Sequence, residues 1–227
     1  MASESESDGS DSDYYVYDIK CTAGESEFSN FFKVSGEILR GDQRKVVGTL
    51  SGIMMIHPTV CDMEAESQML ADLASAAYDL SGSPVTMMDL MDDDDLFSDV
   101  LERCPAFMME YCARVFLLED LKVLPKYQGK KLGLALLKRA LKVVCPDPGS
   151  LAFVKPYPLQ FESPNENLTP KQYKAQWGNL ISTDQDVALK KLIKHYKIMG
   201  FRQLGKSDFW YLDTSYVIRT KEYLSIP

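Results

Sequence analysis

The chain has 227 residues, 45% of them hydrophobic, and a formal net charge of −8, enough apolar content for one domain with a substantial core. An acidic balance argues against non-specific nucleic-acid binding, which needs a basic surface. No apolar run approaches membrane-spanning length and the N-terminus is acidic rather than basic, so we expect a cytoplasmic protein with no membrane segment.

The N-terminal segment 1–13 is rich in Ser, Asp and Glu and has almost nothing apolar. We therefore expect it to be a disordered, solubilising tail, followed by a single domain over 14–227. The five cysteines form no Cys-x-x-Cys pair and have no set of histidines nearby. They are predicted to be reduced core residues and not a metal site. These cysteines are Cys21, Cys61, Cys104, Cys112 and Cys145.

The N-terminal half alternates short strand patterns with helical ones. A strand is predicted over 14–19, where apolar and polar residues alternate. Further strands joined by tight turns are predicted over 37–40 and 45–56, with breaks at Gly41-Asp42 and at Gly48 or Gly52. Apolar residues at helical spacing predict a helix over 63–80, which Gly82 and Pro84 end, and a second helix over 96–101.

Two polar features in this half suggest chemistry. His57 precedes Pro58, and a lone histidine in that position is more typical of a turn than of a catalytic site. The four aspartates 92–95 resemble a metal site only in their number, because a calcium loop needs alternating ligands, a glycine and a terminal Glu. We interpret them as a solvated loop and helix cap, and we predict no metal.

The central segment combines a buried strand, a short basic loop and an amphipathic helix. The continuous apolar run from Val115 continues to Val123, as expected for a strand covered on both faces. From Leu134 to Val144 the apolar residues fall on one helical face. Between them, 128–133 holds two glycines and two lysines where the helix begins. Unpaired N–H groups at a helix N-terminus attract phosphate, so this loop is a candidate pyrophosphate site.

The remaining elements complete a β-α-β unit and its neighbours. A strand over 151–155 follows the helix through a tight turn, which predicts two parallel central strands. An insertion over 162–182 follows, and it could cover a site or be decoration. A helix is predicted from Thr183 or Asp184 to Met199, with Gly200 as its C′ residue. Closing strands are predicted over 209–212 and 216–219.

The loop and the last helix carry a resemblance. Gln128 to Gly133 resembles the acyl-coenzyme A motif Gln/Arg-x-x-Gly-x-Gly/Ala of the GNAT acyltransferase superfamily, with Lys131 where the middle glycine is usual. The end of the last helix, from His195 to Phe201, resembles the second hallmark of that superfamily, an aromatic residue followed by x-x-x-Gly-Phe. In addition, 155–161 resembles a segment in a subgroup of uncharacterised bacterial GNAT-domain proteins.

The resemblance implies an α/β fold: a mixed, twisted sheet that splays apart between its central parallel strands, with helices on both faces. It implies direct transfer of an acetyl group from acetyl-CoA to a primary amine of a small molecule or protein. Backbone N–H groups after Gly129 would hold the pyrophosphate, and the backbone of Leu121 and Val123 would bond the pantetheine arm. The implied coenzyme-binding loop comprises Gln128, Gly129, Lys130, Lys131, Leu132, Gly133 and Leu134.

The same resemblance suggests the catalytic groups. Tyr196 matches the tyrosine that commonly lies near the coenzyme sulfur and acts as general acid. For the base we select Glu119, which follows the apolar run of the central strand, with Asp120 as the second choice. Alternative interpretations are that Tyr196 is a packed aromatic residue and that Glu119 faces solvent.

A catalytically inactive GNAT-like module is the alternative function, acting as a sensor of CoA ligands or as a protein-interaction unit. A P-loop nucleotide-binding protein is excluded because Gly-x-x-x-x-Gly-Lys-Ser/Thr is absent. Fold alone does not determine the acceptor, and a homodimer remains open.

Overall fold

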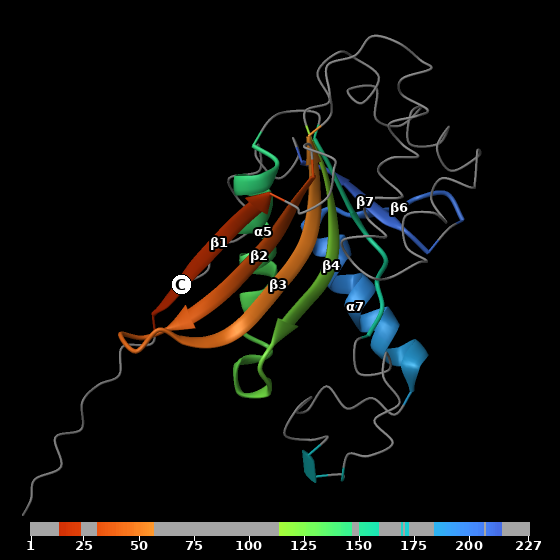
Figure 1. Ribbon diagram of the computed structural model, residues 1–227. Helices are drawn as coiled ribbons and strands as arrows, with labels where there is room; N and C mark the ends of the chain where they lie inside the picture. The colour runs from red at the N-terminus through yellow and green to blue at the C-terminus, as the bar shows by residue number, and fades with distance from the viewer. Residues whose placement is uncertain are drawn as a thin grey trace, which may run out of the picture.

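The computed structural model describes residues 14–23, 31–56, 114–146, 150–158, 169, 171–172, 184–206 and 208–214. They form a seven-strand open sheet with the order β1-β2-β3-β4-β5-β7-β6 (Figure 1). β4 and β5 are parallel, and the other neighbouring strands are antiparallel. The sheet is therefore mixed, and the predicted α/β class and parallel central pair are confirmed.

The strands are β1 (Tyr15–Ala23), β2 (Phe31–Arg40), β3 (Lys45–Ile56), β4 (Arg114–Val123), β5 (Leu151–Val154), β6 (Arg202–Gln203) and β7 (Trp210–Asp213). The helices are α5 (Leu132–Val144) and α7 (Gln185–Met199), and a short 3-10 turn, η1, spans Pro125–Tyr127. No helix within these described residues is long and apolar enough to cross a membrane.

The predicted break at Gly48 or Gly52 was wrong, because β3 runs without interruption from Lys45 to Ile56. The length of the first two strands was also underestimated. β1 continues beyond 19 to Ala23, and β2 begins at Phe31 rather than at 37, because the two strands pair along their whole length, from Tyr15 opposite Arg40 to Ala23 opposite Phe32. The predicted helices 63–80 and 96–101, the strand 216–219, the tail 1–13 and His57 lie outside the described residues, as does most of the insertion 162–182.

A β-bulge interrupts β4. Leu118 lies opposite Gly52 and Asp120 lies opposite Ser51, so Glu119 is the extra residue. An extra residue reverses the alternation of side chains along a strand. Phe116 and Leu118 therefore share the α5 face with Leu121 and Val123, which pack against the same core.

The parallel pairing of β4 with β5 is short. It runs from Val115 opposite Leu151 to Leu118 opposite Val154, and it ends where the bulge begins. β4 itself continues to Val123. The edge of β4 beyond the bulge therefore has no strand partner on the β5 side among the described residues.

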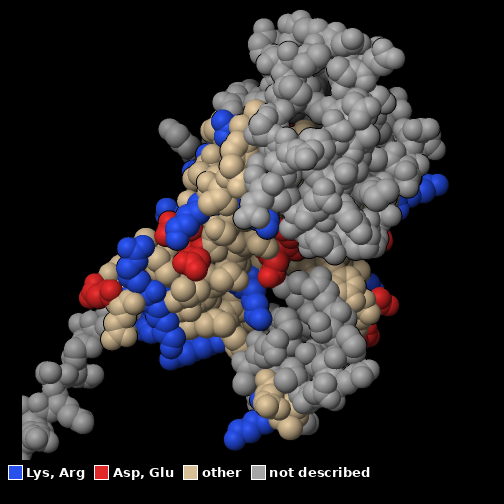
Figure 2. Space-filling view, viewed as in Figure 1, with Lys and Arg blue, Asp and Glu red and all other residues tan. Residues whose placement is uncertain are grey.

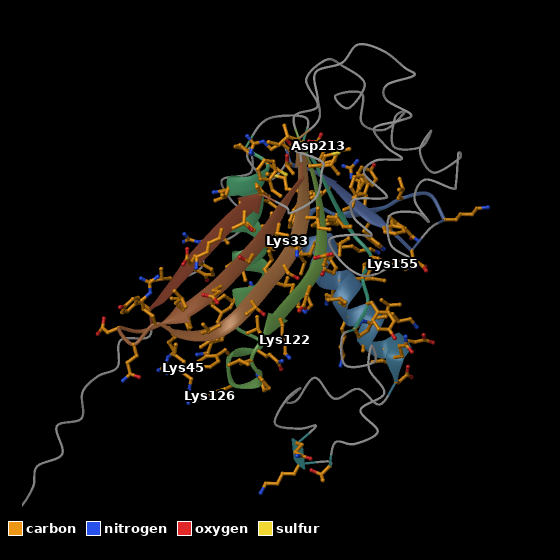
Figure 3. All side chains as sticks on the ribbon, viewed as in Figure 1. Lys33, Lys45, Lys122, Lys126, Lys155 and Asp213 are labelled. Atoms are coloured by element: carbon orange, nitrogen blue, oxygen red, sulfur yellow. The ribbon has the colours of Figure 1, made fainter. Side chains whose placement is uncertain are left out.

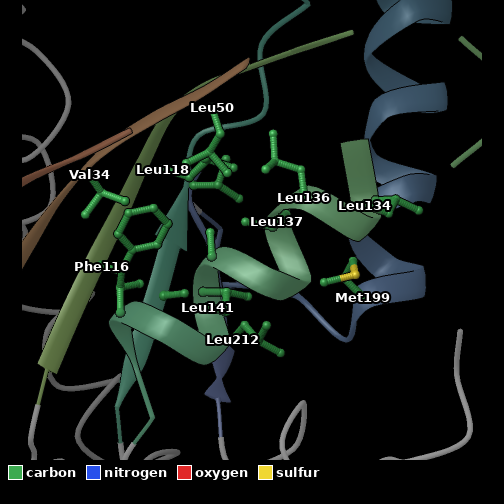
Figure 4. Close-up of a cluster of buried hydrophobic side chains, with 14 of the residues drawn as sticks. Val34, Leu50, Phe116, Leu118, Leu134, Leu136, Leu137, Leu141, Met199 and Leu212 are labelled. Carbon is green, nitrogen blue, oxygen red and sulfur yellow. The ribbon is translucent and has the colours of Figure 1, made fainter. Parts of the chain in front are cut away.

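One core lies on the α5 side of the sheet, which is the far side in Figure 1. Figure 4 shows Leu136, Leu137 and Leu141 of α5 in one buried cluster with Leu50, Phe116 and Leu118 of the sheet and Met199 of α7. Leu136 and Leu137 are fully buried, and burying such side chains contributes about 1.5–3 kcal/mol each. α5 packs against β1, β2, β3 and β4, and α7 contacts α5.

Capping residues define α7 as the sequence predicted. The Asp184 carboxylate accepts hydrogen bonds from the backbone N–H groups of Asp186 (2.9 Å) and Val187 (3.2 Å), so Asp184 rather than Thr183 is the N-cap. Gly200 ends the helix in the left-handed region, at φ 95°. The chain then returns so that Phe201 meets Tyr196 edge-on, with ring centroids 5.4 Å apart.

Candidate functional site

The loop before α5 is tied to three strands. The Gln128 side-chain amide donates to the carbonyl of Val123 at the end of β4 (3.0 Å). The Leu124 N–H donates to Val47 of β3 (2.9 Å), and the Lys130 ammonium reaches the Tyr15 hydroxyl of β1 (3.4 Å). These contacts hold the loop in place before any ligand binds, and they give Gln128 a positioning role.

Two residues of this loop have left-handed backbone. Gly129 has φ 80°, and a Cβ added there would meet nothing within 4 Å, so its surface is open to a ligand. Lys131, at the motif's usual glycine position, has φ 58° and ψ 15°. A lysine can adopt this conformation at a cost of about 1–2 kcal/mol. The conformation that glycine would favour is therefore present without glycine.

Lys131 is also the N-cap of α5, and its side chain makes no capping hydrogen bond. The Ala135 N–H bonds the Lys131 carbonyl (3.1 Å), which begins the ladder of helical bonds. The N–H groups of Leu132, Gly133 and Leu134 precede that ladder and are the ones a helix leaves without intrahelical partners. Their partial positive charge suits a phosphate group.

Positive side chains surround this end of the sheet. Lys45 and Lys126 lie close together there, with Lys122 nearby on β4, as Figure 3 shows, and Figure 2 shows Lys and Arg gathered on the same edge. The Arg40 guanidinium lies 5.8 Å from the ring centroid of Tyr127 in η1. In a chain with a net charge of −8, this local excess of cations favours an anionic ligand.

Beyond the bulge, the backbone N–H and C=O groups of β4 point alternately toward β3 and away from it. Leu124 bonds β3 through its N–H, so strand alternation directs the backbone groups of Leu121 and Val123 away from β3. That direction is the edge where β5 no longer pairs. The Val123 carbonyl is already bonded by Gln128, and the Leu121 N–H bonds the Asp120 carboxylate. The Val123 N–H and the Leu121 carbonyl are therefore the groups directed toward a ligand.

Two neighbouring carboxylates occupy the bulge. Glu119 is exposed as a residue, yet the protein around its carboxyl removes enough water to raise its pKa. The positive charge of Lys33 opposes this rise in pKa, and the negative charge of Asp120 adds to it. Burial also raises the pKa of Asp120, whereas Lys122 and a backbone hydrogen bond from Leu121 lower it.

Tyr196 lies in the last turn of α7, with only 6% of its surface exposed. Burial raises the pKa of its hydroxyl well above the ordinary value, and the negative charge of Asp120 raises it further. The hydroxyl is therefore protonated at neutral pH, which is the form that an acid requires. This coupling places Tyr196 within electrostatic reach of the bulge.

Protein-family models, curated proteins and solved structures give no match to this chain. The fold brings the uncapped N-terminus of α5, the open edge of β4 and the bulge carboxylates to the part of β4 that lies beyond its pairing with β5. Glu119 belongs to that part of β4 and Tyr196 of α7 is within electrostatic reach of it, although no direct contact joins Glu119 and Tyr196 within the described residues.

Some features of the site were not predicted from sequence. The bulge in β4 was not predicted. Two signals could have indicated it: the alternation of apolar residues shifts by one position between Leu118 and Leu121, and Gly52 lies on the opposite strand. Cys21 is exposed on β1, against the prediction of a core residue, whereas Cys145 is buried as predicted. No group of metal-ligating side chains occurs among the described residues.

Proposed function

We propose that this protein is an N-acetyltransferase of the GNAT superfamily, which transfers an acetyl group from acetyl-CoA directly to a primary amine. The observation that carries the proposal is the end of β4–β5 pairing at Leu118. There the bulge, the open strand edge and the uncapped α5 N-terminus adjoin. The strand order and the αL backbone at Lys131 are consistent with the resemblance of the motifs.

In this proposal some groups of the chain bind the coenzyme, and others transfer protons. The first N–H groups of α5 and Lys130 bind the pyrophosphate, and the open edge at Leu121 and Val123 aligns the pantetheine arm. Alignment of the thioester with the amine supplies much of the acceleration. Glu119 accepts a proton from the amine, and Tyr196 donates one to the departing thiolate.

The rival is a GNAT-like module that binds coenzyme A ligands or a protein without turnover. The observation that favours it is the lysine at the αL position, because the Lys131 side chain is exposed and adds a cation where glycine gives close backbone approach. Binding and turnover therefore have to be measured separately.

The first experiment is a calorimetric titration with acetyl-CoA, using desulfo-CoA and ATP as comparison ligands. We expect both coenzymes to bind and ATP to bind much more weakly. Lys130→Ala should weaken the coenzyme by about fivefold, equivalent to about 1 kcal/mol for an exposed charge pair. Lys142→Ala is the matched control, because Lys142 is an exposed lysine at the opposite end of α5.

A second experiment measures release of the free thiol in the presence of a panel of amines. Tyr196→Phe should reduce turnover by at least about 100-fold while leaving coenzyme affinity unchanged. Absence of coenzyme binding would refute the proposal. Binding with no turnover on any amine would favour the rival module.

A further inference from the structure

The outer edge of β1 is long and regular. β1 is the first strand in the sheet order and has only β2 beside it among the described residues, and it forms one margin of the sheet in Figure 1. Its nine residues pair with β2 without a bulge, and none of them is a proline. Such an edge presents a row of backbone groups to any strand that approaches it.

The opposite edge of the sheet lacks these properties. β6 is only two residues long and begins with an arginine. A very short, charged edge strand resists pairing with another chain, whereas a long and regular one invites it. β1 carries two charged residues, Asp18 and Lys20. Their Oδ2 and Nζ atoms lie 3.6 Å apart, so the strand has no net formal charge to repel a partner.

The backbone of β1 determines which residues face outward. The Gly41 N–H donates to the Tyr14 carbonyl (3.2 Å), and these two residues continue the register in which Tyr15 lies opposite Arg40. In an antiparallel pair the direction of the hydrogen bonds alternates from one residue to the next. The even-numbered residues of β1 therefore bond β2, and the odd-numbered residues from Tyr15 to Ala23 direct their N–H and C=O groups outward.

A second copy of β1 has few registers open to it. Twofold symmetry requires each residue to lie opposite one on the same face of the sheet, so one residue of β1 must lie opposite its own counterpart. With Ile19 at the axis the whole strand is paired, because Ile19 is the central residue of Tyr15–Ala23. An axis one residue to either side would place Asp18 opposite Asp18 or Lys20 opposite Lys20, and like charges in these positions are destabilising.

The register centred on Ile19 brings opposite charges together. Asp18 lies opposite Lys20 of the partner subunit, and Lys20 lies opposite Asp18 of the partner subunit. These pairs have no backbone hydrogen bonds between them, so their Cα atoms approach to about 4.5 Å. The four side chains alternate in sign around the axis, and such a network is stronger than an isolated surface ion pair. In the same register the Val16 side chain, which is 40% exposed, meets Thr22 of the partner subunit.

We propose that β1 is a homodimerisation edge, at which two copies of this chain pair in antiparallel orientation through Tyr15–Ala23 about a twofold axis at Ile19. The two sheets then form one continuous sheet. The partner is a second copy of this chain rather than an unrelated strand, because the charges of β1 complement one another only in this self-pairing. The dimer requires nothing of the proposed reaction.

The test measures the mass of the full-length protein by sedimentation velocity as a function of concentration. Wild-type protein should dimerise. Asp18→Lys replaces both attractive pairs with repulsive ones and should weaken the dimer at least about tenfold. Lys20→Asp should weaken it more, because Glu37 of β2 already lies opposite Asp18. The double variant Asp18→Lys/Lys20→Asp restores opposite charges and should bring the dimer Kd back to within about threefold of wild type.

A second pair of variants tests the backbone contact. The Cys21 N–H faces outward, so Cys21→Pro removes a donor from the free edge without removing a bond to β2. This variant should remain folded and lose the dimer. Thr22→Pro is the matched control, because the Thr22 N–H is directed toward β2. It should lower Tm at concentrations where wild-type protein is monomeric.

The outcomes decide the proposal independently of catalysis. A wild-type protein that stays monomeric at every concentration overturns the dimer, and would mean that another part of the chain covers this edge. A dimer that neither charge variant weakens, or that the double variant fails to restore, also overturns it, because the copies would then meet on another surface. Coenzyme binding by the same variants is a separate measurement and tests only the proposed function.

Discussion

Gly52 permits the bulge in β4, and replacing it with alanine should destabilise the fold. A Cβ at Gly52 would overlap the Leu117 carbonyl oxygen and lie 2.7 Å from the Cε2 and Cζ atoms of Phe116. Phe116 is fully buried, and the carbonyl belongs to a strand that pairs on both sides. Neither atom group can move away without disturbing its neighbours.

Overpacking of a core costs about 1–3 kcal/mol, and a clash with backbone belongs at the upper end. For a chain of this size, about 3 kcal/mol corresponds to a decrease in Tm of about 6–12 °C. The measurement is thermal unfolding followed by circular dichroism. Gly133→Ala is the control, because its Cβ would lie 3.4 Å from Val123 in an ordinary contact.

The control should leave Tm unchanged or slightly higher, since alanine is the better helix former. A Gly52→Ala variant whose Tm stays within about 2 °C of wild type would refute the reasoning. That result would mean that β3 and β4 can separate locally at the bulge without loss of packing.

Three further predictions concern a turn, a cap and a carboxylate. Lys131→Gly should stabilise the protein by about 1 kcal/mol in urea unfolding, because glycine adopts the left-handed backbone conformation without the strain that a lysine side chain causes. The control Lys130→Gly should not stabilise the protein. Equal effects of the two substitutions would exclude relief of strain. In the same urea unfolding assay, Asp184→Ala should lower the free energy of unfolding by about 1 kcal/mol, because it removes the N-cap of α7. Asp186→Ala should lower it distinctly less. The reverse order would contradict the capping geometry. Burial raises the folded-state pKa of Asp120 above its ordinary 3.8, so stability decreases as its ionisation begins and pH rises through that range. Asp120→Asn should therefore raise Tm at pH 7, and the gain should vanish below pH 3.8; a gain that persists there would have another cause.

Local signals predicted the elements on which the site is built. The helix from Leu134 to Val144, the cap at Asp184 and the αL residue Gly200 each follow from side chains within one turn. The parallel pair followed from a strand, a helix and a strand joined by tight turns. Such features depend on neighbours in sequence, which is why residue patterns reveal them.

The arrangement within the site depends on contacts between distant residues. The bulge at Glu119 exists because Gly52, far away in sequence, leaves room for Leu117 and Phe116. The tie between Lys130 and Tyr15 joins positions separated by 115 residues. The full length of β2 likewise depended on its pairing with β1 and β3. No local pattern contains this information.

The sheet's connections have a consequence for the order of folding. β1, β2 and β3 are successive antiparallel neighbours, whereas β4 meets β5 only after α5 has formed the crossover. Contacts between near neighbours form faster than contacts that close long loops. We therefore expect the meander to assemble early and the β4–β5 junction late. A newly made chain would then complete its candidate site among the last steps, after the β1–β3 meander has formed.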